Sequence, residues 1–146
     1  MKNKRIWYVL FALYCFVMLR LLFDRAGYDP ALPYAQQLKY NIVPFQTITR
    51  FLKVLLRGGS LGSKTHAIIN LFGNVIMFIP LGFCLPIVRP RLNRFWKVIL
   101  STAVIITLVE LTQLLTLVGS CDTDDLILNV LGSAMGYGFY RLFFRK

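Results

Sequence analysis

Hydrophobic residues are concentrated in four long runs, at residues 6–23, 67–88, 98–118 and 126–144. Each run is close to the roughly 20 residues with which a helix crosses the hydrocarbon core of a bilayer. Only short segments separate the second run from the third and the third from the fourth, so these helices should be antiparallel neighbours. The pattern predicts an all-α, polytopic membrane protein with four transmembrane helices, organised as a single domain over residues 1–146.

The long connection between the first two runs, residues 24–65, has a different pattern. Its first part, residues 24–40, is interrupted by prolines and predicts an irregular loop. Residues 45–57 predict an amphipathic helix, with apolar and basic residues on different faces. The apolar face holds Phe45, Ile48, Phe51, Leu52 and Leu55, and the basic face holds Arg50, Lys53 and Arg57. Such a helix lies in the membrane interface near lipid phosphates, and the glycine-rich residues 58–63 should follow it as a flexible hinge.

Composition and charge support this interpretation. The chain is 57% hydrophobic with a mean hydropathy of +0.62, which is too apolar for a water-soluble domain of this length. A net charge of +11 would suit nucleic acid, but the basic residues do not form the continuous basic face that follows phosphates, so no nucleic-acid partner is expected. The clusters at residues 2–5, 89–97 and 141–146 contain no acidic residue, and such clusters stay on the cytoplasmic side. We therefore expect a multi-pass protein of the cell membrane with both termini inside.

Two further features limit the chemistry. The first run follows a basic leader, as in a signal peptide, but no clear cleavage site precedes Asp24, so we interpret the run as an uncleaved span. The cysteines Cys15, Cys84 and Cys121 have no metal-binding or redox spacing and are interpreted as packing residues. No metal ion and no cofactor is expected.

The few polar residues inside the hydrophobic runs are the candidate site. They form three pairs at helical spacing, Asn70 with Asn74, Glu110 with Gln113, and Asp125 with Asn129. The rise of a helix places Asn74 about 10 Å, Glu110 about 12 Å and Asn129 about 6 Å below the outer boundary of the bilayer. All three pairs thus fall in the outer half of the membrane. A buried charge needs a partner, and Arg20 near the outer end of the first run is the expected partner of Glu110 or Asp125.

Small residues and prolines should shape the interior of the bundle. Glycine at positions 73, 82, 132 and 136 adds small surfaces, and the last two form a small-xxx-small pattern that lets helices approach closely. Pro80 and Pro86 should bend or end the second span. Two interpretations of the polar pairs stay open: they stabilise contacts between helices, or they line a pocket that opens to the outer leaflet.

Four blocks of the chain, in order, resemble the VanZ-like family, which is named after a protein associated with resistance to the lipoglycopeptide teicoplanin. The blocks are residues 41–48, 70–82, 110–113 and 122–132. The resemblance implies a helical membrane protein of the bacterial cell envelope without an established reaction. Its recurrent positions map onto Asn70, Gly73, Asn74, Phe78, Pro80, Gly82, Glu110, Gln113, Asp125, Asn129 and Gly132. Many relatives have an arginine where this chain has Ser120 and Cys121, so a headgroup contact would come here from Arg20, Arg50 or Lys64.

Three functions follow as hypotheses. The favoured one is a non-enzymatic protein that contacts membrane lipids and binds an amphiphile in the outer leaflet, such as a lipoglycopeptide or a lipid-linked cell-wall precursor. The second is an intramembrane enzyme with Glu110 as general base and Asp125 or His66 assisting, although no nucleophile elbow, metal-ligand cluster or phosphate loop accompanies it. The third is a small transporter, which the apolar inner half disfavours in a monomer. The sequence does not determine the oligomeric state.

Overall fold

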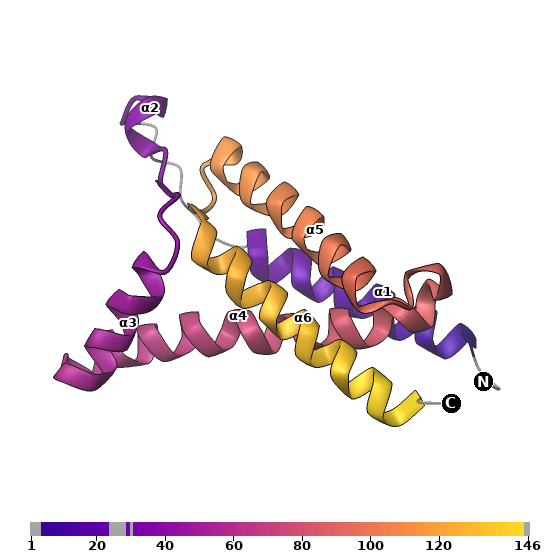
Figure 1. Cartoon of the computed structure of the whole chain (residues 1–146). Coiled ribbons are helices and arrows are strands. Elements are labelled where there is room, and N and C mark those ends of the chain that lie inside the picture. Colours follow the sequence, from indigo (N-terminus) through magenta and orange to yellow (C-terminus); the bar gives the residue numbers. More distant parts are fainter. Residues whose placement is uncertain (1–3, 24–28, 30, 145–146) are drawn as a thin grey trace.

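The computed structural model describes residues 4–23, 29 and 31–144, and this part of the chain is a bundle of four long helices (Figure 1). These are α1 (Lys4–Phe23), α4 (Leu61–Val88), α5 (Phe95–Thr116) and α6 (Thr123–Phe144). The shorter elements are α2 (Tyr34–Gln37), β1 (Tyr40–Asn41), α3 (Gln46–Arg57), η1 (Pro90–Leu92) and β2 (Cys121–Asp122). The predicted all-α architecture is confirmed. The predicted loop at residues 24–40 lies partly outside the described residues, and its described part contains α2.

Three of the described helices, α1, α4 and α5, are long and apolar enough to cross a membrane. The fourth predicted span, α6, also has 22 residues, or about 33 Å. Its mean hydropathy is lower because its first turn contains Asp124 and Asp125, and because Asn129, Arg141 and several glycines interrupt its apolar residues. The amino-terminal end of α1, η1 and the carboxyl-terminal end of α6 lie at one end of the bundle, and the connection between α5 and α6 lies at the other (Figure 1).

The membrane-length helices begin a few residues before the predicted boundaries, and the largest difference is at α4. We expected a flexible hinge at residues 58–63, but α4 begins at Leu61. Ser60 caps the helix by accepting the backbone N–H of Ser63 at 3.2 Å. The irregular connection between α3 and α4 is therefore restricted to residues 58–60, and the hinge is shorter than predicted.

The helix α4 runs without interruption through Pro80 and Pro86, so neither proline ends it. Its contact with α6 is the tightest in the bundle. A Cβ atom added to Gly82 would lie 1.9 Å from the Ser133 carbonyl oxygen, and one added to Gly132 would lie 2.0 Å from that of Val75. The predicted close approach at residues 132 and 136 is confirmed, because Gly136 meets the Ile79 carbonyl in the same way.

The amphipathic helix predicted at residues 45–57 is α3, and it packs on the first turns of α4. The ring of Phe51 contacts that of His66, with 5.5 Å between the ring centroids. Phe45 and Leu52, which were predicted on the apolar face, are exposed. Their side chains are therefore not covered by the described part of the bundle.

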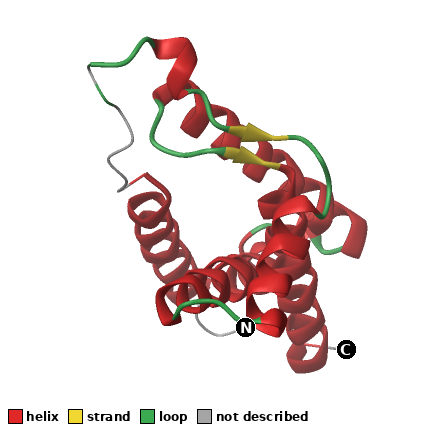
Figure 2. Cartoon of the chain, turned by 90° about the vertical axis from the view of Figure 1, so that its left-hand side faces the viewer, coloured by secondary structure: helices red, strands yellow, loops and turns green. Residues whose placement is uncertain are grey.

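A short parallel pairing of β1 with β2 fixes the long connection to the α5–α6 turn (Figure 2). Tyr40 pairs with Cys121 and Asn41 pairs with Asp122. This pairing places the amino-terminal end of α3 beside the amino-terminal end of α6. The site described below lies directly beneath this junction.

Candidate functional site

A cavity of about 350 Å³ lies among α1, α4, α5 and α6, and we call it the polar chamber. All six predicted polar residues of the hydrophobic runs line it: Asn70, Asn74, Glu110, Gln113, Asp125 and Asn129. The rest of its wall consists of Leu21, Leu22, His66, Ile69, Gly73, Met77 and Ser120. The structure thus brings the three predicted pairs together around one space.

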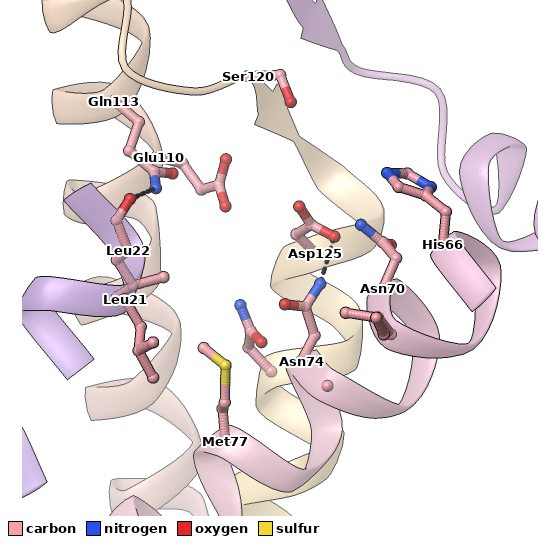
Figure 3. Close-up of a pocket in the computed structure, with 13 residues that line it drawn as sticks. Leu21, Leu22, His66, Asn70, Asn74, Met77, Glu110, Gln113, Ser120 and Asp125 are labelled. Carbon is pink, nitrogen blue, oxygen red and sulfur yellow. Dashed lines mark hydrogen bonds between the residues drawn. The ribbon is translucent and has the colours of Figure 1, made fainter. Parts of the chain in front are cut away.

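The helical spacing of the pairs explains why they converge. Residues three or four positions apart share one face of a helix. Figure 3 shows Glu110 and Gln113 on the α5 side of the chamber, with Asp125 and Asn74 across from them. Asn74 donates its side-chain amide to Asp125, which joins α4 to α6 (Figure 3). Each helix therefore presents one polar face toward the same interior.

Gln113 closes the chamber toward α1. Its Nε2 donates a hydrogen bond of 2.7 Å to the Leu22 carbonyl oxygen in the last turn of α1 (Figure 3). The side chain is buried, so this bond is sheltered from competing water. One N–H of the Gln113 side chain thus holds the end of α1 in position.

Glu110 has both a structural contact and a place in the wall of the chamber. The residue is 6% exposed, and its carboxylate accepts the backbone N–H of Asp122 at 3.0 Å. This contact fastens the middle of α5 to the chain just before α6. One carboxylate oxygen of Glu110 therefore joins α5 to the segment that precedes α6.

Two residues that line the chamber have a side-chain amide oxygen without a hydrogen-bond donor among the described residues. Asn129 is 3% exposed, and no donor in the described part of the chain reaches its Oδ1. The Oδ1 atom of Asn70 is likewise buried without a donor among these residues. A buried acceptor without a hydrogen bond costs about 1–3 kcal/mol. Both residues line the chamber, so these two acceptors lie in its wall or directly behind it.

The predicted basic residues lie elsewhere. Arg20 is exposed and does not line the polar chamber. The pairing of Arg20 with the carboxylate of Glu110 or Asp125 therefore stays a prediction. Arg50 donates to Thr47 Oγ1 at 3.2 Å and lines a separate cavity over α3 and α4. His66 lines both cavities and so lies between them.

Sequence reasoning missed a group of residues that holds α3 over the chamber. Asp122 accepts hydrogen bonds from Thr47 Oγ1 at 2.7 Å and from Asn41 Nδ2 at 3.2 Å. Asp124, which is fully buried, accepts the backbone N–H groups of Phe45 and Ile48. Asp124 thus caps a helix that lies far away in the sequence.

The signal for this group is present in the sequence, in the polar positions of blocks 41–48 and 122–132. Acidic residues at a helix start usually interact with the dipole of their own helix. From the sequence, this usual role is the expected one, and their hydrogen bonds to the distant helix α3 are not. Phe45 adopts a left-handed backbone conformation with φ of 64°, unusual for a residue with a side chain. The hydrogen bond from its N–H to Asp124 helps to hold it there.

The electrostatics favour a ligand that donates hydrogen bonds. The chamber wall contains two carboxylates and four amides, and its described lining includes neither lysine nor arginine. Just above the chamber, partial burial raises the pKa of the Cys121 thiol, and the carboxylates of Glu110 and Asp122 raise it further. This thiol is therefore protonated near neutral pH and is a poor nucleophile.

Comparison with known families and proteins gives one match. A family model described as VanZ/LLP1 matches residues 7–144. No curated protein matches the chain, and no solved structure matches it.

Proposed function

The chain belongs to the VanZ/LLP1 family, and from this premise we propose that it is a four-span membrane protein that binds the headgroup of an amphiphile in the polar chamber. The observation that carries the proposal concerns two residues that line this space, Asn129 and Asn70, whose buried side-chain oxygens have no donor among the described residues. A headgroup with hydroxyl, amide or ammonium groups would supply the missing donors. The function is binding, with no reaction required.

The proposed orientation places the chamber in the outer leaflet. In it α6 is the fourth span, and both termini are cytoplasmic. Supporting this, the basic residues 89–97 lie at the same end of the bundle as the start of α1 and the end of α6, which is the arrangement that the positive-inside rule predicts. The exposed Arg50, Lys53 and Arg57 of α3 would then lie at the outer interface near lipid phosphates.

The other two hypotheses have less support. A general base needs a carboxylate oxygen within reach of the substrate, and Glu110 already uses one oxygen to hold the Asp122 backbone. A transporter needs a polar path through the inner half of the membrane. The buried residues of α4 at that level, including Leu81, Leu85 and Val88, are apolar.

The test of headgroup binding removes the orphaned oxygens. We expect Asn129→Leu to weaken capture of a lipid-linked cell-wall precursor by the protein in lipid nanodiscs at least tenfold, because about 1.4 kcal/mol of hydrogen bonding is lost. Native mass spectrometry of the nanodiscs measures the bound fraction. Asn70→Leu, at a less buried position, should have the same direction of effect.

The matched control is Asn93→Leu, since Asn93 is exposed in the turn at the opposite end of the bundle. Thermal unfolding of each variant identifies any that fails to fold. Folded Asn129→Leu and Asn70→Leu proteins that capture the precursor as well as the wild type would overturn headgroup binding.

The family membership also motivates a role in glycopeptide resistance, which we include in the proposal. Expression of the chain should lower bacterial sensitivity to acylated glycopeptides such as teicoplanin more than to glycopeptides without an acyl chain. The reason is that an amphiphile site in the membrane interacts only with molecules that enter the bilayer. Minimum inhibitory concentrations measure this, and equal protection against both classes would exclude recognition of the amphiphile.

A further inference from the structure

An apolar groove of about 570 Å³ runs between α1, α4 and α5, and we call it the tail groove. Its wall includes Met18 of α1, Leu81 of α4 and Ile105 of α5. Along α1 it extends from Tyr8 to Leu22, a distance of about 21 Å. One leaflet of the hydrocarbon core is about 15 Å deep, so the groove is longer than a leaflet.

The tail groove is apolar although two tyrosines line it. The hydroxyl of Tyr14 donates to the Met77 carbonyl oxygen at 2.9 Å, and that of Tyr8 donates to the Val88 carbonyl oxygen at 3.3 Å. Both polar ends are therefore satisfied by the backbone of α4. Apart from Cys15 and the terminal Arg89, the other residues that line the groove are hydrophobic.

The groove and the polar chamber are neighbours along the same helices. Leu22 lines both spaces, so one leucine side chain stands at their boundary. Met77 and Phe78 are successive residues of α4 that line the chamber and the groove respectively. On α5, Glu110 lines the chamber and its predecessor Val109 lines the groove. On α1, α4 and α5 alike, the residues that line the polar chamber therefore give way to those that line the apolar groove at the same depth along the bundle.

We propose that the tail groove holds the hydrocarbon chain of the same amphiphile whose headgroup lies in the polar chamber. This inference rests on the proposed function and adds to it the class of ligand. The ligand has a headgroup rich in hydrogen-bond donors and one hydrocarbon chain that reaches past the middle of the bilayer. Arg89, which lines the far end of the groove, marks the opposite membrane boundary.

The experiment uses two alkyl glucosides, with C8 and C16 chains, each with a photoactivatable diazirine near the chain end, added to the full chain in phosphatidylglycerol nanodiscs. After irradiation, mass spectrometry identifies the labelled residues. We expect the C16 probe to label Tyr8, Leu85 and Val88, which line the far end of the groove. Leu13 and Leu108, which are exposed on the outside of the bundle, should be labelled much less.

A matched pair of substitutions in α1 separates occupation of the groove from general contact with lipid. Cys15→Trp fills the groove, whereas Val17→Trp adds the same side chain at an exposed position that does not line it. We expect Cys15→Trp to lower capture of the C16 glucoside at least tenfold and to leave the C8 glucoside unchanged. Val17→Trp should change neither.

The possible results distinguish the two proposals. If the wild type captures both glucosides but the C16 label spreads evenly over the outer surface, or Cys15→Trp has no effect, the tail groove is overturned and headgroup binding stands. If the wild type captures neither glucoside and Asn129→Leu leaves precursor capture unchanged, the proposed function falls and this inference falls with it. Groove labelling that is lost in Cys15→Trp and retained in Val17→Trp supports both.

Discussion

Substitution of Gly132 by alanine should separate α4 from α6 and destabilise the protein by about 3 kcal/mol, the upper part of the range for overpacked cores. The reason is geometric, because the added Cβ would lie 2.0 Å from the Val75 carbonyl oxygen. The atom in the way belongs to the backbone of α4, so it cannot move aside by a change of rotamer as a side-chain atom could. Denaturant unfolding in detergent micelles measures the change in the free energy of unfolding.

Gly138→Ala in the same helix is the control. No atom lies within 4 Å of the Cβ that it would add. Alanine is the better helix former by about 1 kcal/mol, so this variant should be as stable as the wild type or slightly more stable. Equal destabilisation by Gly132→Ala and Gly138→Ala would show that the close contact of α4 with α6 is not what these glycines provide.

The second large effect is expected at Asp124. Asp124→Ala removes the acceptor of two backbone N–H groups, those of Phe45 and Ile48, from a fully buried position. Hydrogen bonds to a charged group contribute about 1.5–3 kcal/mol each, so we expect a loss of about 3 kcal/mol. The effect should be local, since α3 is the element that these bonds hold.

Hydrogen exchange followed by mass spectrometry measures this effect by region. Protection should fall across residues 46–57 and remain in α4, α5 and the second half of α6. Thr49→Ala is the control, because the Thr49 hydroxyl is exposed and its partners among the described residues are the carbonyls of residues 45 and 46. Unchanged protection of α3 in Asp124→Ala would contradict the assignment of this carboxylate as its anchor.

Local periodicity was sufficient to predict the helices and the convergence of the polar pairs. The runs of apolar residues determine where the long helices lie, and spacing of three or four fixes which residues share a face. Asn70 and Asn74, or Asp125 and Asn129, can therefore be placed on one wall without knowledge of the partner helix. The existence of the chamber followed once these helices were neighbours.

The position of Arg20, the anchoring of α3 and the length of the hinge could not be predicted from the periodicity of apolar residues. The direction of Arg20 depends on the rotation of α1 about its own axis, and an almost wholly apolar helix gives little information on that angle. The anchoring of α3 by Asp124 joins residues about 80 positions apart, through a turn and a two-residue strand pair. The hinge was predicted too long because the cap at Ser60 competes with the flexibility of the surrounding glycines.

The way in which α1 is attached determines how its neighbours can vary in evolution. Apart from Met18, its described residues are at least partly exposed, and its polar attachments run to main-chain carbonyls: Tyr8 to Val88, Tyr14 to Met77 and Gln113 to Leu22. Every amino acid supplies a carbonyl, so the accepting positions can change side chain without loss of these bonds. The donors Tyr8, Tyr14 and Gln113 have no such freedom, and selection on the attachment of α1 therefore acts on one partner of each pair.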